Sequence, residues 1–182
     1  EDSFEVQEGC MESAAERFFE PTFEAGTTGT QAGAYSPLVI KVNRNDGEQE
    51  LKSLNFTLPK ELLGKPAGIP YCSDAAIREA EGKSGRTELA SPSCPAASKL
   101  GTVDAAAGVG SEPFHTTGSV YWAGPYEGAP FSAVVVTPAV AGPFDLGDVV
   151  VRAPLFVDPE TALVTTKSDP LPTATKRSPS SI

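Results

Sequence analysis

Short apolar runs separated by glycine and proline turns make up most of the chain, a pattern typical of β-strands. Residues 131–137 are apolar on both faces, which predicts a central strand. In residues 118–123, Val120 and Trp122 lie on one face and Ser119 and Tyr121 on the other. Five more segments with strand-like patterns are 38–42, 50–58, 102–107, 148–157 and 161–167.

Turn signals between these segments predict hairpins. Asn45, Asp46 and Gly47 tolerate positive φ, so we expect a hairpin that joins 38–42 to 50–58. The Asp-Pro-Glu sequence at 158–160 is expected to join 148–157 to 161–167. Antiparallel strands at this spacing predict a mainly β fold, an antiparallel β-sandwich of Ig-like or jelly-roll-like type.

One short helix is expected, at residues 74–82. The segment Asp-Ala-Ala-Ile-Arg-Glu-Ala-Glu-Gly has an N-cap candidate, good helix formers and a closing glycine. It lies between two of the three cysteines.

The cysteines indicate an oxidising compartment. Cys72 and Cys94 stand in polar segments rich in serine and proline, and the chain has a single histidine and no Cys-x-x-Cys motif. A zinc site is therefore not expected, and a Cys72–Cys94 disulfide that closes the helical segment is the best interpretation. Such a bridge contributes roughly 3 kcal/mol and is typical of exported proteins. Cys10 is left without a partner.

Length and charge limit the function classes. The chain has 182 residues and a net charge of −10, and eight of its 24 acidic residues fall within residues 1–25. The negative charge argues against nucleic acid and anionic membranes as partners. No apolar run is long enough to span a membrane. We expect one module over residues 1–172 and a disordered tail over 173–182, which is polar and rich in serine and threonine.

No catalytic pattern stands out. His115 is expected to be a loop or strand-edge residue, and no Gly-x-Ser-x-Gly elbow accompanies it. No pair of acids is distinguished for glycoside hydrolysis. We therefore expect no enzyme, no catalytic residue, no metal site and no cofactor.

Aromatic residues are the remaining candidates for ligand binding. Tyr121, Trp122, Tyr126 and Phe131 lie within eleven residues of sequence. Trp122 is expected in the core, whereas Tyr126 lies in a glycine- and proline-rich turn that favours the surface. Tyr121 and Tyr126 are the candidate ligand-binding residues, and a polysaccharide is the ligand that such aromatics suit.

Four stretches carry a resemblance to a known family: 25–37, 58–75, 91–103 and 120–172 (Val-Tyr-Trp-Ala-Gly-Pro through Asp-Pro-Leu-Pro). The chain resembles an uncharacterised family of large, repetitive exported or cell-surface proteins from high-GC Gram-positive bacteria. The resemblance implies an exported β-rich repeat module of no known activity, and Cys72 and Cys94 match the family's cysteine pair. Similar proteins continue beyond 169–172 into further strands, which raises the interpretation that the module is incomplete at its C-terminus.

Three hypotheses follow. The first is a non-enzymatic extracellular structural or adhesive module of a larger exported protein, whose partners are neighbouring repeat modules or cell-surface components. The second is a carbohydrate-binding module that uses aromatics around Tyr126. The third and weakest is a hydrolase.

Overall fold

The structure is a computed structural model that describes residues 13, 16–29, 31, 33–59, 64, 66–108 and 110–172. Contacts within the chain define two compact units, Glu1–Glu50 and Leu51–Ile182, and each is described by itself. The expected tail at 173–182 lies outside the described residues, and one module over residues 1–172 stays a prediction. The fold is mainly β, as expected, while the Ig-like or jelly-roll-like sandwich type stays a prediction.

The first unit contains a two-stranded antiparallel sheet. Strand β1 (Thr22–Thr27) pairs with β2 (Leu38–Asn43) in a register that sets Phe23 opposite Val42. The Asn-Asp-Gly segment does turn, since Glu48 N donates to Asn45 O over 3.3 Å. The expected hairpin across it is wrong, however, because β2 pairs with a strand that precedes it in the chain.

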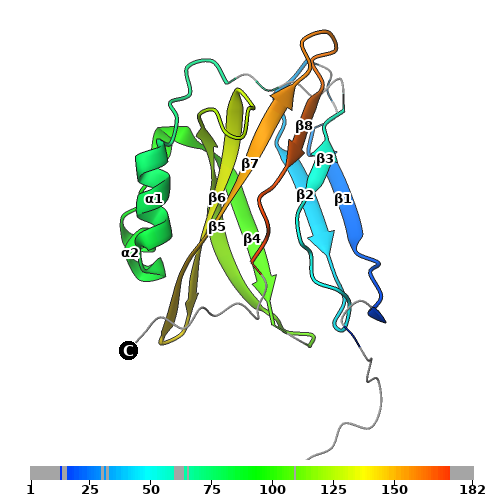
Figure 1. Ribbon diagram of the computed structural model, residues 1–182, viewed down its shortest axis with the longest axis vertical. Coiled ribbons are helices and arrows are strands. Elements are labelled where there is room, and N and C mark those ends of the chain that lie inside the picture. Colours follow the sequence, from blue (N-terminus) through cyan, green and yellow to red (C-terminus); the bar gives the residue numbers. More distant parts are fainter. Residues whose placement is uncertain are drawn as a thin grey trace, which may run out of the picture. The chain divides into compact units, whose positions relative to one another are not determined.

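The second unit is built on a six-stranded antiparallel sheet of order β3-β8-β7-β6-β5-β4. Its strands are β3 (Asn55–Thr57), β4 (Lys99–Ala107), β5 (Phe114–Ala123), β6 (Phe131–Ala141), β7 (Phe144–Val157) and β8 (Val164–Lys167). The sheet curls along its strands (Figure 1). Strand β6 is central, as its apolar pattern predicted, and the Asp158 turn joins β7 to β8, also as predicted.

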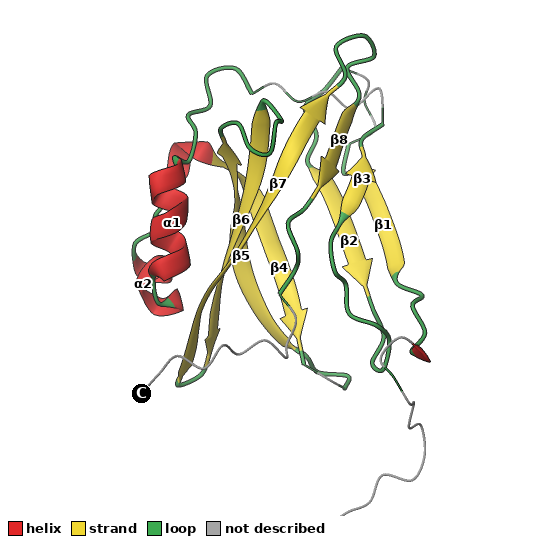
Figure 2. Ribbon diagram, in the orientation of Figure 1, coloured by secondary structure: helices red, strands yellow, loops and turns green. Residues whose placement is uncertain are grey.

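Two helices cover one face of this sheet (Figure 2). Helix α1 (Asp74–Gly82) has the bounds that the sequence predicted, and the Ser73 side chain caps it by accepting from Ala76 N. Helix α2 (Gly85–Ala90) was not predicted; Ser84 caps it in the same way by accepting from Thr87 N. A 3₁₀ turn, η2 (Ala96–Ser98), leads into β4.

The core lies between the helices and the sheet. Ile77 and Ala80 of α1 pack with Val134 and Val136 of β6, and all four are buried. Strand β5 approaches β6 closely at Gly118, where a Cβ atom would lie 2.5 Å from Val136 O. Only glycine fits this position without displacing backbone, so it sets how closely β5 and β6 approach each other.

The opposite face of the sheet carries an aromatic stack. Trp122 is 8% exposed, which confirms that it packs in the interior. Its ring centroid lies 5.0 Å from that of Phe131 and 6.3 Å from that of Tyr71. Trp122 pairs in register with Ala133 of β6. The Trp122 indole is therefore a packing residue of the interior.

Candidate functional site

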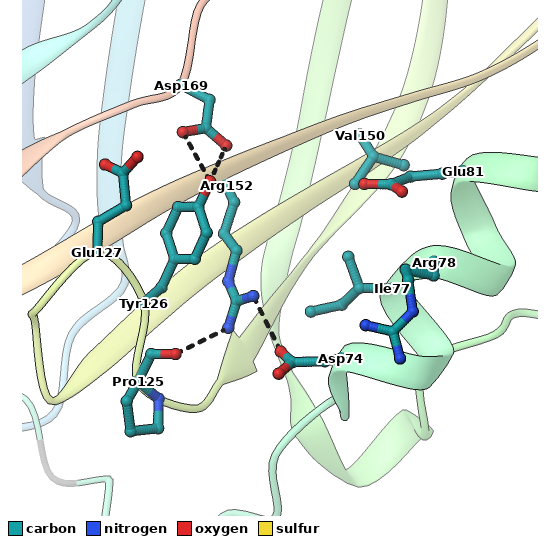
Figure 3. Close-up of a pocket in the computed structure, with 10 residues that line it drawn as sticks. All are labelled: Asp74, Ile77, Arg78, Glu81, Pro125, Tyr126, Glu127, Val150, Arg152 and Asp169. Atoms are coloured by element: carbon teal, nitrogen blue, oxygen red, sulfur yellow. Dashed lines mark hydrogen bonds and ion pairs between the residues drawn. The ribbon is translucent and has the colours of Figure 1, made fainter.

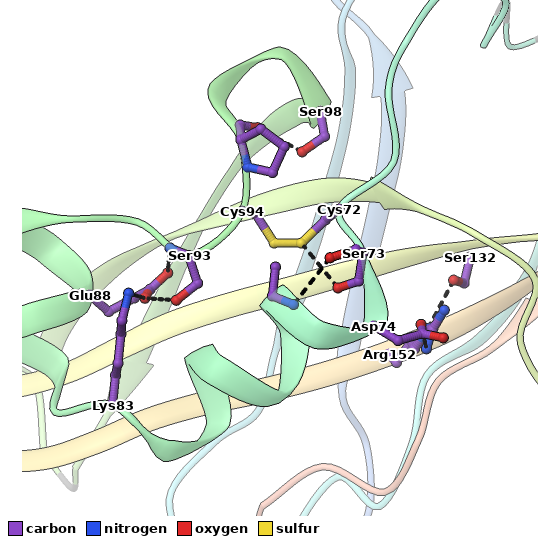
Figure 4. The surroundings of a disulfide bond; sticks show 12 residues. Cys72, Ser73, Asp74, Lys83, Glu88, Ser93, Cys94, Ser98, Ser132 and Arg152 are labelled. Atoms are coloured by element: carbon purple, nitrogen blue, oxygen red, sulfur yellow. Dashed lines mark hydrogen bonds and ion pairs between the residues drawn. A yellow bond between two sulfur atoms is a disulfide. The ribbon is translucent and has the colours of Figure 1, made fainter.

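A disulfide joins the two ends of the segment that contains both helices (Figure 4). Cys72 precedes α1 and Cys94 follows α2, and their Cα atoms lie 5.0 Å apart, which confirms the predicted bridge. Both residues are buried. Cys72 N also donates to Trp122 O on β5 over 2.8 Å. The bridge thus joins the two ends of the segment 72–94, and the bond from Cys72 N attaches them to β5. Cys10 lies outside the described residues.

Hydrogen bonds at Asp145 hold α2 against the hairpin of β6 and β7. The Asp145 carboxylate accepts from Gly85 N at 2.8 Å and from Arg86 N at 3.0 Å, both at the start of α2. A third bond comes from Gly147 N at 3.0 Å. The backbone donors of Arg86, Gly147 and Gly85 lower the pKa of Asp145, because they favour the charged carboxylate.

A buried acidic group lies nearby on β7. Both carboxylate oxygens of Asp148 are inaccessible to solvent and have no hydrogen-bond partner within the described part of the chain. Burial, and then the charges of Glu88 and Asp145, raise the pKa of Asp148 to about 6, against the lowering effect of Lys83. Glu88 is itself buried, but it accepts from Ser93 N and Ser93 Oγ at 2.8 and 2.6 Å. Asp148 is therefore the unsatisfied charge beneath α2.

Arg152 on β7 connects three parts of the second unit. Its Nη1 donates to Asp74 Oδ1 on α1 at 2.9 Å, and its Nε donates to Ser132 Oγ on β6 at 3.0 Å. Its Nη2 reaches the carbonyl oxygens of Gly124 and Pro125 at 3.3 and 3.4 Å. The side chain is 11% exposed. Arg152 therefore links α1, β6 and the turn after β5 through hydrogen bonds that its side chain donates within the protein.

Tyr126 lies in the turn between β5 and β6 and contacts the same arginine. The Arg152 guanidinium carbon lies 4.3 Å from the Tyr126 ring centroid. The Tyr126 hydroxyl donates to the Asp169 carboxylate, with 3.1 Å to each oxygen. Burial and then this bond to Asp169 raise the pKa of Tyr126. One face and the hydroxyl of this tyrosine are thus already occupied within the protein.

These groups line a pocket of about 380 Å³ between α1 and the sheet (Figure 3). Ile77, Val150, Pro125 and the Tyr126 ring supply its apolar surface. The remaining lining residues are charged and come from α1, the turn, β7 and the segment after β8: Asp74, Arg78, Glu81, Glu127, Arg152 and Asp169. The volume lies at the lower end of the range for ligand pockets, roughly 300–1,000 Å³.

The two tyrosines singled out from the sequence occupy different environments. Tyr121 is 5% exposed and belongs to the core, so it does not line the pocket. Tyr126 is half-buried and lines it. Sequence reasoning missed Arg152, Asp74 and Asp169. A signal for Arg152 existed, because it is the single charged residue in the otherwise apolar run 149–157.

The remaining candidates for chemistry are sparse. His115 Nδ1 lies 3.0 Å from Asp104 Oδ1, with side chains 60% and 65% exposed, on β5 and the edge strand β4. This solvated pair differs from a catalytic dyad, whose acid is buried. Among the described residues, no three of His, Cys, Asp and Glu gather as metal ligands. No helix in that part of the chain is long and apolar enough to cross a membrane.

Comparisons of the chain with protein-family models, with curated proteins and with solved structures found no match.

Proposed function

We propose that this protein is a non-enzymatic extracellular structural or adhesive module of a larger exported protein. Its partners in this proposal are neighbouring repeat modules or cell-surface components. The Ig-like or jelly-roll-like sandwich expected from the sequence belongs to the same proposal. The observation that carries it is the buried disulfide between Cys72 and Cys94.

The disulfide supports an oxidising compartment because it closes a segment of two short helices that has little other stabilisation. Helices α1 and α2 have nine and six residues. Helices of this length are not stable alone in water. Within α1 only Ile77 and Ala80 are buried. A bridge that closes the segment at both ends stabilises its docking, and such bridges persist in secreted or surface proteins.

The chemistry of the surface supports a binding or structural role over catalysis. Arg152 and Tyr126, two of the polar residues that line the pocket, are engaged with each other and with neighbouring residues. A general base or nucleophile needs a partner aligned with a reacting atom. The His115–Asp104 pair is open to solvent, which competes for its hydrogen bond. The hydrolase hypothesis therefore has the least support.

Sedimentation with bacterial cell walls tests the proposal. Oxidised protein is mixed with purified wall preparations and with intact cells, and the bound fraction is measured against protein concentration. The proposal expects saturable binding, or concentration-dependent self-association in the absence of walls by analytical ultracentrifugation. The same samples are assayed for hydrolysis of ester, peptide and glycoside substrates. Turnover that survives repurification, without binding or self-association, contradicts the proposal.

A carbohydrate-binding module is the second candidate, and one observation favours it. Tyr126 supplies an aromatic ring to a pocket of about 380 Å³. Calorimetric titration with monosaccharides and disaccharides of cell-wall type tests this candidate, with Tyr126→Ala as the variant. Binding that is lost in the variant while the fold is retained supports it. No heat change at millimolar sugar excludes it.

A further inference from the structure

The six-stranded sheet ends at two strands that differ in length. Strand β3 has three residues, whereas β4 has nine and contains no proline. A strand at the end of a sheet pairs on one side only, so alternate backbone N–H and C=O groups on its outer side have no strand partner. Strand β4 therefore presents the longer row of open hydrogen-bonding groups.

The alternation of hydrogen bonds across the sheet identifies these open groups. Arg152 O accepts from Asp169 N on the β8 side over 2.8 Å, so the backbone of Arg152 faces away from β6. The registers of β6, β5 and β4 carry this alternation to Val103, whose backbone groups face β5. Within the described residues, no backbone hydrogen bond reaches the groups that point outward. They belong to alternate residues of β4: Thr102, Asp104 and Ala106.

Strand β4 has little of the protection that edge strands usually carry. Natural edges are kept from pairing by prolines, bulges and charged side chains. The bulge of β4 lies at its start, between Lys99 and Gly101. Beyond the bulge the strand has one charged residue, Asp104, and that carboxylate lies 3.0 Å from His115 Nδ1 on β5. The other side chains there are small, so a second strand can approach the backbone closely.

The sequence of β4 is complementary to itself in one antiparallel register. Residues with outward groups must lie opposite each other, so a two-fold axis passes through a residue. An axis at Asp104 sets two carboxylates opposite each other, which is destabilising. An axis at Thr102 sets Asp104 opposite Leu100, and an axis at Ala105 shortens the pair. An axis at Val103 sets each Asp104 opposite a Thr102, whose hydroxyl is a donor.

We propose that two copies of this protein associate through β4, antiparallel about a two-fold axis at Val103. The paired segment then spans the whole strand, Lys99–Ala107, and the two six-stranded sheets become continuous. The inference rests on the proposed function and names its partner, because the neighbouring module is a second copy of this chain. Backbone hydrogen bonds supply the affinity, as in other cases of strand addition to a sheet edge.

Disulfide trapping tests the register. In a Cys10→Ser background, Val103→Cys places a thiol opposite its own copy, in a pair whose Cα atoms lie about 4.5 Å apart. This separation permits a disulfide. Ala105→Cys is the control, because it faces Gly101 of the other copy. On non-reducing gels we expect the covalent dimer of Val103→Cys to form about tenfold faster than that of Ala105→Cys. Equal rates overturn the proposal.

Opposite charges at Thr102 give a matched comparison in solution, with the dimer dissociation constant measured by analytical ultracentrifugation. Thr102→Asp sets a carboxylate opposite each Asp104 and should weaken the dimer about tenfold, whereas Thr102→Lys should strengthen it by a similar factor. Adding Asp104→Lys to Thr102→Asp should restore the dimer. Thr165→Asp and Thr165→Lys make the same charge changes at an exposed position of β8 and should have no effect. Equal effects at Thr102 and Thr165 overturn the proposal.

Wall sedimentation and the hydrolysis assays separate this inference from the proposed function. If the wild type binds walls but stays monomeric up to millimolar concentration, the adhesive function holds and pairing through β4 is overturned. If the dimer responds to the Thr102 variants as expected in a protein that turns over substrate, pairing through β4 is supported and the non-enzymatic function is contradicted. A dimer that ignores both the Thr102 and the Val103 variants uses another surface and overturns the proposal.

Discussion

Arg152 and Tyr126 contact each other face-on, with the guanidinium carbon 4.3 Å from the ring centroid. The contact links β7 to the turn between β5 and β6. The same arginine also bonds Asp74 at the start of α1. One side chain on a central strand therefore holds together the elements that form the pocket.

Replacing this arginine should destabilise the second unit. Arg152→Met keeps the apolar stem but removes the bonds to Asp74 and Ser132 and the contact with Tyr126. Bonds to a charged, largely buried group contribute most when their partners are also buried, and Ser132 is fully buried. We expect the free energy of unfolding to fall by about 2–3 kcal/mol in urea denaturation.

Asp74→Asn is the control, because the Asp74 side chain is 62% exposed. Exposed ion pairs contribute at most about 1 kcal/mol. A cost for Asp74→Asn equal to that of Arg152→Met would show that the arginine acts through this surface pair alone.

Trp122 should be a core residue in energetic terms. Trp122→Ala removes an indole that is 8% exposed and stacks on Phe131 and Tyr71. We expect a loss of about 3–5 kcal/mol in chemical denaturation. Tyr71 is 46% exposed in the same stack, so Tyr71→Ala should cost less than half as much. Unchanged stability of Trp122→Ala, with loss of sugar binding, would instead identify a binding residue.

The buried carboxyl of Asp148 predicts a dependence of stability on pH. Its pKa is raised from an ordinary value of 3.8 to about 6 in the folded protein. Between these values the folded state keeps a proton that the unfolded state has lost, so stability falls as pH rises from 4 to 6. Asp145 and Asp158 have lowered pKa values. Their contributions to the free energy of unfolding are therefore lost only as pH falls below the usual aspartate range.

Asp148→Asn should therefore remove this dependence. Asp148 as a whole residue is only partly buried, which reduces the effect, so we expect about 1 kcal/mol of added stability at pH 7.5. The gain should vanish near pH 4. Thermal unfolding at half-unit pH steps measures both values. A variant that is less stable than the wild type at pH 7.5 would show that the charged form is stabilised in the fold.

The disulfide should stabilise the second unit through the segment that it closes. The bridge spans 22 positions of sequence. Replacing both Cys72 and Cys94 by serine should lower the free energy of unfolding by roughly 3 kcal/mol. Cys10→Ser, which leaves the bridge intact, is the matched control for loss of a sulfur. Equal stability of the double variant and the control would mean that docking of the helices does not need the bridge.

Local signals in the sequence predicted the local elements. Helix α1 was predicted with its bounds because an N-cap candidate at its start, good helix formers and a closing Gly82 mark both of its ends. The turn at Asp158 was found for the same reason, and its carboxylate bonds Glu160 N and Thr161 N. Helix α2 was missed because six residues give too little periodicity, although Ser84 was a visible cap.

Long-range pairing could not be predicted in the same way. A good turn follows β2, yet β2 pairs with β1, because the partner of a strand is chosen by packing over the whole fold. The pocket likewise depends on packing between segments that are distant in the sequence. Asp74 and Asp169 lie 95 positions apart in the sequence and meet only through Arg152 and Tyr126. No local motif carries that information.

Peptide mapping of native protein, alkylated without reductant, tests the central claim most directly, since the proposed function is carried by the disulfide. After proteolysis under non-reducing conditions, the account predicts a covalently joined pair of peptides that contains Cys72 and Cys94, neither of them alkylated. Their S–S bond should persist in glutathione buffers of cytosolic poise, as in structural disulfides of exported proteins. Alkylation of both cysteines in freshly purified protein, with the fold intact, would contradict it.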